Sequence, residues 1–236
     1  MKKFALKMLI SLSVIAFSLA TISCSNESID NSKTNAANSA PLTLEDAVKQ
    51  QDPASRAANT WFIKKYIFNR TNGAGGLGHV GVAFELRATI NGTTYTSFYQ
   101  GGVEGTNGWF GIPNAFTPIG GNNGGWWNQV TTQAQMINEF RARRYNRYKF
   151  GVVFIMSSQY ESDNTKNILA RFPNRGYAVP SNNCMNASYD VINSFSGFNG
   201  SPSVPTQYLP NRRYDSLPVG SSVAGSGGWS NSVNFQ

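Results

Sequence analysis

The segment from His79 to Gln100 reads HVGVAFELRATINGTTYTSFYQ, and it decides the fold class. Its first eight and last eight residues are rich in β-branched and aromatic side chains, which predicts two strands. Asn91 and Gly92 between them are the dipeptide favoured in two-residue type I′ hairpins. We therefore predict an antiparallel hairpin over residues 79–100.

Further strands and helices are predicted around this hairpin. Residues 61–68 and 149–156 have the composition of strands. Helices are predicted from about 133 to 146, after a Thr132–Gln135 capping box, from Asp163 or Asn164 through Phe172, and from Cys184 to about Phe195. This mixture predicts a single α+β domain in which helices pack on an antiparallel sheet.

The composition indicates a folded core and excludes several classes of protein. Of the 236 residues, 40% are hydrophobic and 13% aromatic, which excludes global disorder. The 23 glycines and 10 prolines leave no sustained heptads, so a coiled coil is excluded. With one histidine and two cysteines, we expect no metal site, no disulfide scaffold and no cofactor.

The first 23 residues have the pattern of a secretory signal peptide. Lys2, Lys3 and Lys7 precede a short apolar run that extends to Ile22. Removal of this segment lowers the formal net charge from +8 to about +5. The remaining basic residues gather only over residues 141–147, so we expect no nucleic-acid partner.

Residues 21–24, Thr-Ile-Ser-Cys, resemble a bacterial lipobox, in which the cysteine becomes the lipidated first residue. Thr21 stands where such boxes usually have leucine. We predict a lipid on Cys24 that anchors the protein to a membrane of the bacterial cell envelope, at the outer membrane or the periplasmic face. Plain secretion is the alternative if Cys24 is not lipidated.

The composition changes along the exported chain and suggests three regions. Residues 24–58 are polar and predict a flexible tether, within which a short helix over residues 44–50 is an option. Residues 59–196 contain the predicted strands and helices and form the catalytic-type domain. Residues 197–236 are rich in Gly, Ser and Pro, and they predict either a closing strand with loops or a mobile tail.

The candidate chemistry rests on Cys184 and His79. Cys184 begins a predicted helix, where the helix dipole stabilises a thiolate and free backbone N–H groups can hold an oxyanion. His79 begins a strand after a glycine-rich loop, and histidine is the usual base for a cysteine nucleophile. The alternatives are that Cys184 is a buried, inert thiol and that His79 is a half-buried ring with satisfied hydrogen bonds. A disulfide between Cys24 and Cys184 is a further option, and it requires that Cys24 is not lipidated.

A third group should orient the imidazole, and the hairpin offers two candidates. If Asn91 and Gly92 are the turn, Glu104 lies directly opposite His79. Gln100 lies on the same face of the sheet, because strand faces alternate. Either side-chain oxygen would accept a hydrogen bond from the ring, and the choice between them stays open.

These motifs resemble those of the circularly permuted papain-like cysteine hydrolases, which include the lecithin retinol acyltransferase-like group and permuted NlpC-type peptidases. The resemblance is carried by residues 78–82, Gly-His-Val-Gly-Val, on the first hairpin strand. It is also carried by residues 182–184, Asn-Asn-Cys, at the start of a distant helix. It extends over residues 60–196, and the hairpin is longer than is usual in the family.

The resemblance implies an antiparallel sheet with the nucleophile helix packed on it, and thiol attack on an amide or ester through an acyl-enzyme. It implies Cys184 as nucleophile and His79 as base, and it favours Gln100 over Glu104 as the third residue. We expect a peptide or a peptidoglycan stem peptide as substrate, with a lipid ester as another option. An exported toxin or effector on the same fold is not distinguished from this hydrolase, and no oligomeric state is predicted.

A different class of function is the alternative. The long loop over residues 101–128 contains Trp109, Trp126 and Trp127 among many glycines and asparagines. Such a loop suits a non-catalytic surface lipoprotein that binds a glycan or a protein. The same aromatic residues would equally line an acyl groove or plug the core beneath the loop.

Overall fold

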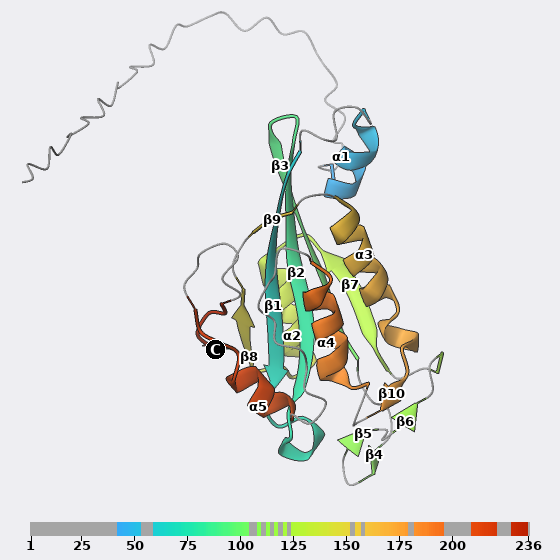
Figure 1. Cartoon of the computed structure of the whole chain (residues 1–236), viewed down its shortest axis with the longest axis vertical. Helices are drawn as coiled ribbons and strands as arrows, with labels where there is room; N and C mark the ends of the chain where they lie inside the picture. The colour runs from blue at the N-terminus through green and yellow to red at the C-terminus, as the bar shows by residue number, and fades with distance from the viewer. Residues whose placement is uncertain are drawn as a thin grey trace, which may run out of the picture. The chain divides into compact units, whose positions relative to one another are not determined.

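Figure 1 shows a computed structural model of the chain. The structure describes residues 42–52, 59–103, 108–109, 112–113, 116–117, 120–121, 124–151, 154–156, 159–178, 182–195, 209–220 and 228–235. The predicted signal peptide, Cys24 and Glu104 lie outside these residues.

The described residues form α-helices, short 3-10 helices and strands. The helices are α1 (Leu44–Gln50), η2 (Ala74–Gly76), α2 (Gln133–Ala142), α3 (Gln159–Ala170), η3 (Phe172–Asn174), α4 (Cys184–Asn193) and α5 (Pro210–Asp215). The longer strands are β1 (Thr60–Arg70), β2 (His79–Ile90), β3 (Thr93–Gly102), β7 (Trp126–Val130) and β8 (Arg147–Phe150). The short strands are β4 (Gly108–Trp109), β5 (Ile112–Pro113), β6 (Phe116–Thr117), β9 (Phe154–Met156), β10 (Tyr177–Ala178) and β11 (Val233–Asn234).

The central sheet is antiparallel and confirms the predicted α+β class. Its strand order is β11-β8-β1-β2-β3-β7, and β9 also pairs with β1. The predicted hairpin is β2 and β3, in the predicted register, with Val82 opposite Gly101. Asn91 and Gly92 have φ values of 51° and 78°, so both turn residues are left-handed, as a type I′ turn requires.

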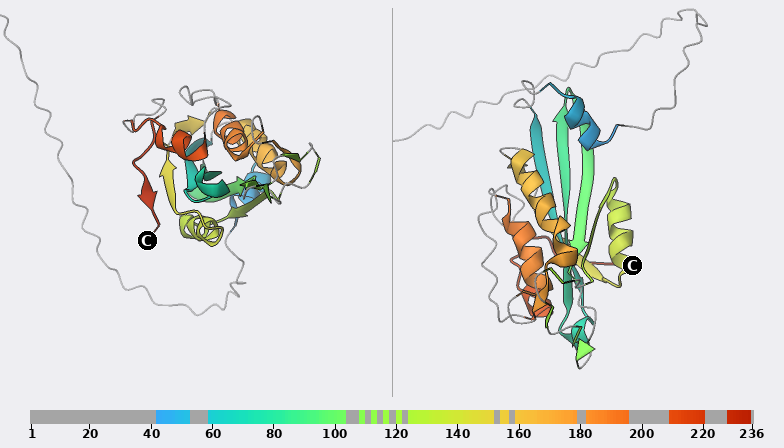
Figure 2. Two further views of the ribbon diagram at one scale, coloured as in Figure 1. Left: turned by 90° about the horizontal axis from the view of Figure 1, so that it is seen from below. Right: turned by 90° about the vertical axis from the view of Figure 1, so that its right-hand side faces the viewer.

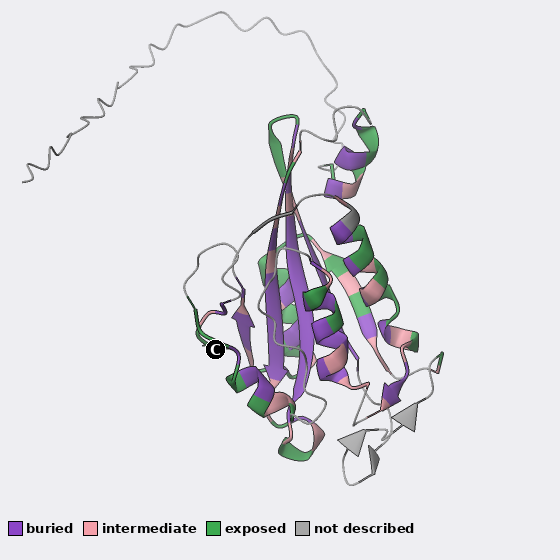
Figure 3. Cartoon of the chain, viewed as in Figure 1, coloured by how far each residue is buried: buried purple, intermediate pink, exposed green. Residues whose placement is uncertain are grey.

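The sheet separates two hydrophobic clusters. Figure 2 shows α3, α4 and α5 on one face and α2 on the other. Alternation along β2 places Val80, Val82 and Phe84 in the larger cluster with α4, whereas Ala83 lies in the smaller cluster with α2. Both faces of the central strands are therefore buried (Figure 3), and neighbouring residues of one strand point into different cores.

Two predicted helices have different ends in the structure. The capping box of Thr132 and Gln135 is confirmed, but α2 ends at Ala142, four residues earlier than predicted. Arg144 has a φ of 67°, which turns the chain out of the helix. The predicted helix start at Asp163 or Asn164 is wrong, because α3 begins at Gln159 and both residues lie inside it.

The predicted strand over residues 149–156 is two strands. β8 ends at Phe150, Gly151 forms an isolated bridge with Trp229, and β9 begins at Phe154. β8 and β9 pair with different parts of β1.

The α1 helix belongs to the folded core. Leu44, Ala47 and Val48 are buried in the larger cluster. Tyr99 and Gln129 both donate hydrogen bonds to the Glu45 carboxylate. Folded structure therefore begins before residue 59, where the sequence predicts the domain boundary. Toward the other end of the chain, α5 packs on β1 and β2, and β11 pairs with β8 at the sheet edge.

Candidate functional site

Cys184 is the first residue of α4, as predicted. The Asn183 side chain accepts hydrogen bonds from the backbone N–H groups of Met185 and Asn186, at 2.9 and 3.2 Å. The Asn186 side chain accepts one in return from the backbone of Asn183, at 3.2 Å. This capping box starts the helix at the predicted residue. Cys184, Ser188, Val191 and Phe195, which are spaced three or four residues apart, are all buried.

The Cys184 thiol lies within the larger core. Its residue is only 2% exposed, and its side chain interacts with that of Tyr177 on β10. Burial, followed by the nearby charge of an ionised Cys184, raises the pKa of Tyr177. Tyr177 therefore stays a neutral hydroxyl beside the sulfur at physiological pH.

His79 begins β2, also as predicted, and its ring lies near Tyr145, in the segment that follows α2. The ring centroids of His79 and Tyr145 are 5.6 Å apart, and Arg70, its register partner on β1, lies over the same tyrosine. Burial, followed by the positive charge of Arg70, lowers the pKa of His79 to about 3. The imidazole is therefore neutral at pH 7 and a much weaker base than one whose pKa lies near 7.

The alternation of side chains along β2 indicates that the thiol and the imidazole lie on different faces of the sheet. Val80 lies in the same cluster as Cys184, so the side chain of His79, one residue away on β2, points to the opposite face of the sheet. Both residues lie at the same end of the sheet, since β2 and α4 start there (Figure 1). Direct proton transfer between them would require hydrogen-bond distance.

Gln100 lies on the same face of the sheet as His79 but farther along it. It pairs with Ala83, and the four residues from Ala83 to His79 span about 13 Å along the strand. That distance exceeds the reach of the Gln100 side chain. Gln100 is fully buried, and neither polar atom of its side chain has a hydrogen-bond partner among the residues that the structure describes.

The tryptophans of the long loop lie in different environments. Trp126 is 9% exposed and packs edge-on against Phe140, with the Arg143 guanidinium 3.9 Å from its ring centroid. Trp126 is thus a core residue, whereas Trp127, the next residue of β7, is 43% exposed. The side chain of Trp109 lies outside the described part of the chain.

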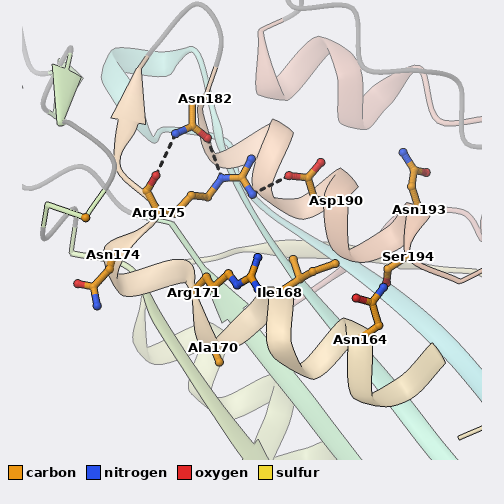
Figure 4. Close-up of a pocket in the computed structure, with 11 residues that line it drawn as sticks. Asn164, Ile168, Ala170, Arg171, Asn174, Arg175, Asn182, Asp190, Asn193 and Ser194 are labelled. Carbon is orange, nitrogen blue, oxygen red and sulfur yellow. Dashed lines mark hydrogen bonds and ion pairs between the residues drawn. The ribbon is translucent and has the colours of Figure 1, made fainter. Parts of the chain in front are cut away.

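A groove of about 930 Å³ lies between α3 and α4 (Figure 4). Ile168 and Ala170 are its apolar side chains. Its polar lining includes Asn164, Asn174, Asn182, Asn193, Ser194 and Asp190. The groove adjoins the start of α4, because Asn182 is two residues before Cys184.

Two arginines also line this groove. Arg175 donates from Nε to Oδ1 of Asn182 at 2.7 Å and pairs through Nη1 with Oδ2 of Asp190 at 2.6 Å. Asn182 donates back to the backbone oxygen of Arg175 at 3.2 Å. The second guanidinium belongs to Arg171, at the end of α3. Figure 4 shows the contacts that hold Arg175 in place.

Sequence reasoning missed the groove. The sequence assigns Asn182 only to a helix start, and it pairs Arg175 with no residue. The partner, Asp190, is fifteen residues away on another element. The frequent asparagines between residues 164 and 193 are a signal of a polar surface, but they do not show which residues share a groove.

The described residues contain neither a cluster of metal ligands nor a membrane-spanning helix. Among them, no group of three or more His, Cys, Asp or Glu side chains is arranged to hold a metal ion. None of the helices that the structure describes is long and apolar enough to cross a membrane.

Comparisons with known proteins add one similarity. No protein-family model matches the chain, and no curated protein matches it either. Among solved structures, the type VI secretion system effector TseH is similar to it, with a TM-score of 0.37 and 18% sequence identity. The similar region covers 66% of this chain and 88% of that chain. A similarity of this size does not assign the chain to a family.

Proposed function

We propose that the chain is an exported binding protein that holds a glycan in the groove between α3 and α4. The groove itself is the observation that carries the proposal. Its volume of about 930 Å³ is in the range of sites for small and medium-sized ligands.

The chemistry of the groove favours a ligand rich in hydroxyl groups. Each asparagine side chain both donates and accepts hydrogen bonds, and so does each sugar hydroxyl. Four asparagines line the groove, whereas Ile168 is its largest apolar residue.

The groove is also preorganised on one side. Arg175 is held by Asn182 and Asp190 before any ligand binds. Groups that are already ordered lose less conformational entropy on binding, which favours affinity.

Binding to a glycan array, followed by titration calorimetry on the full-length protein in detergent, tests the proposal. Asn164 and Asn193 are exposed in the groove. We expect the Asn164→Leu and Asn193→Leu variants to bind at least tenfold more weakly, since each loses a hydrogen-bonding amide. Asn138→Leu, on the exposed side of α2, is the matched control and should bind normally. Equal binding by all variants, or no glycan binding, would contradict the proposal.

Hydrolysis by Cys184 through a Cys–His acyl-enzyme mechanism is the second candidate, and the position of the thiol favours it. Cys184 begins α4, next to the proposed groove, where the helix dipole stabilises a thiolate. The bond attacked would be an amide, in a peptide or a peptidoglycan stem peptide. His79 would act as the base where its ring comes within hydrogen-bond distance of the thiol.

The rate of iodoacetamide alkylation across pH tests this second candidate. A dyad predicts a thiol that titrates well below a free cysteine and loses this property in His79→Ala. Tyr177→Phe, which keeps the imidazole and removes only the phenol next to the sulfur, is the comparison variant. Alkylation that is unchanged in His79→Ala would exclude the Cys184–His79 pair.

We propose in addition that Cys24 carries the lipid that anchors the domain to the envelope. The apolar run before it and the lipobox-like tetrapeptide at residues 21–24 support this anchor. Metabolic labelling with an alkyne fatty acid should label the full-length chain but not Cys24→Ala. Equal labelling of the two, or none, would favour plain secretion.

A further inference from the structure

We propose that the ligand of the α3–α4 groove is an acidic glycan whose carboxylate is bound by Arg171 and Arg175. This inference rests on the proposed function and specifies the charge of the ligand. It is drawn from the balance of charged groups along the groove and from the way in which one of them is held.

The guanidinium of Arg175 is fixed in orientation by its neighbours. Nε faces Asn182 and one hydrogen of Nη1 faces Asp190, at 2.7 and 2.6 Å. A guanidinium has five N–H donors in a planar fork, so these two contacts leave three donors for other partners. A carboxylate is the group that fits such a fork with two parallel hydrogen bonds.

Arg171 supplies a second positive charge in the same groove. It is exposed and forms no ion pair with another residue of the described chain. It lies one helical turn before Arg175 in sequence, and both side chains line the groove in Figure 4.

Among the described residues that line the groove, Asp190 is the only carboxylate. It balances one of the two arginines, so the described groove has a net charge of +1 before a ligand binds. Asp190 is itself half exposed, with a side-chain exposure of 53%, so solvent already weakens its field. A ligand carboxylate would pair with the charge that is left, and the asparagines would pair with its hydroxyls.

The test compares acidic oligosaccharides with their own neutral forms. The probes are hyaluronan, heparosan and oligogalacturonate fragments, each with a counterpart in which the carboxylates have been reduced to alcohols. Titration calorimetry with the full-length protein in detergent measures each pair in low salt. We expect at least one acidic fragment to bind tenfold or more tightly than its reduced form, with the difference shrinking in higher salt.

Three variants connect the effect to the groove. Arg171→Gln should reduce the preference for the acidic form at least tenfold. Arg175→Lys keeps the charge beside Asp190 but loses the fork, so it should also weaken acidic binding, with thermal melting used to verify its fold. Arg212→Gln removes the same charge from an exposed position on α5 and should change nothing.

The outcomes separate this inference from the proposed function. If reduced and acidic forms bind equally well, the acidic ligand is excluded while glycan binding stands. If acidic binding is equally strong in Arg171→Gln and in wild type, the assigned residues are wrong and the inference fails. If no acidic or reduced glycan binds, both the inference and the proposed function fail.

Discussion

At the scale of single residues, burial determines what the candidate catalytic groups can do. The imidazole and the thiol are both nearly inaccessible, with 5% and 2% of the residue exposed for His79 and Cys184. Low accessibility disfavours a charged imidazolium, and the adjacent Arg70 disfavours it further. The histidine and the cysteine therefore lie in buried surroundings that favour side-chain packing and disfavour proton transfer.

Because His79 is the single histidine of the chain, the effect of burial on its pKa can be measured directly. We expect the ring of His79 to remain neutral from pH 8 to pH 4 in the folded protein, because its pKa is lowered to about 3. A histidine in the unfolded chain titrates near pH 6.5 and binds its proton there, which favours unfolding as the pH falls from about 6.5 to 3. Stability should therefore decrease over this window by up to roughly 1.4 kcal/mol per pH unit from this group.

NMR titration of the imidazole and urea denaturation across pH measure the two effects. The stability of His79→Gln should lack this component of the pH dependence, and Arg70→Met should raise the pKa of His79 without restoring its ordinary value. A His79 that titrates near pH 6.5 in the folded state would show that the ring is solvated.

At the scale of elements, two glycines show different reasons why a larger residue is not tolerated, one in the backbone conformation and one in the packing. Gly92 has a φ of 78° in the hairpin turn, and a Cβ there would meet no atom within 4 Å. A Cβ on Gly81 of β2 would lie 2.7 Å from Cε1 of Phe140 and 2.9 Å from the hydroxyl of Tyr145. The hairpin turn requires a glycine at position 92. At position 81, the close approach of Phe140 on α2 and of Tyr145 after it requires one.

These two positions predict different costs for the same change. Gly92→Ala should destabilise the protein by about 1 kcal/mol, because only the left-handed backbone opposes it. Gly81→Ala should cost about 1–3 kcal/mol or more, since the packed rings must move. Urea denaturation gives both values, and a Gly81→Ala that is no worse than Gly92→Ala would contradict the close packing of α2 on β2.

At the scale of the whole molecule, the N-terminal helix belongs to the folded unit. The α1 helix contributes Leu44, Ala47 and Val48 to the larger core. Glu45 connects it to Tyr99 and Gln129 on the sheet and lies 3.8 Å from the ammonium of Lys166 on α3. The α1 helix therefore joins the end of the hairpin to the layer of helices.

Two truncations test this assignment. Removal of residues 1–41 should leave the melting temperature of the remaining chain unchanged. Removal of residues 1–58 should lower stability by at least about 3 kcal/mol, because the burial of two large aliphatic side chains is lost. Thermal melting of both truncated chains decides the point, and equal melting temperatures would place α1 outside the folded unit.

The sequence alone determined the local features of this protein. Neighbouring residues carry the information for the β2–β3 hairpin with its Asn91–Gly92 turn and for the capping boxes of α2 and α4. It also predicted the α+β class, because alternation and helical periodicity are local patterns. These parts needed no knowledge of distant contacts.

Only the tertiary structure decided which face of the sheet each helix covers. Residue spacing shows that His79 and Val80 point in opposite directions, but the side on which α4 packs depends on the whole path of the chain. The packing side of α4 determines that Cys184 lies on the face opposite His79. The same packing places Asp190 of α4 within ion-pair distance of Arg175. The burial of apolar surface on both faces drives this arrangement, and it is a property of the whole core.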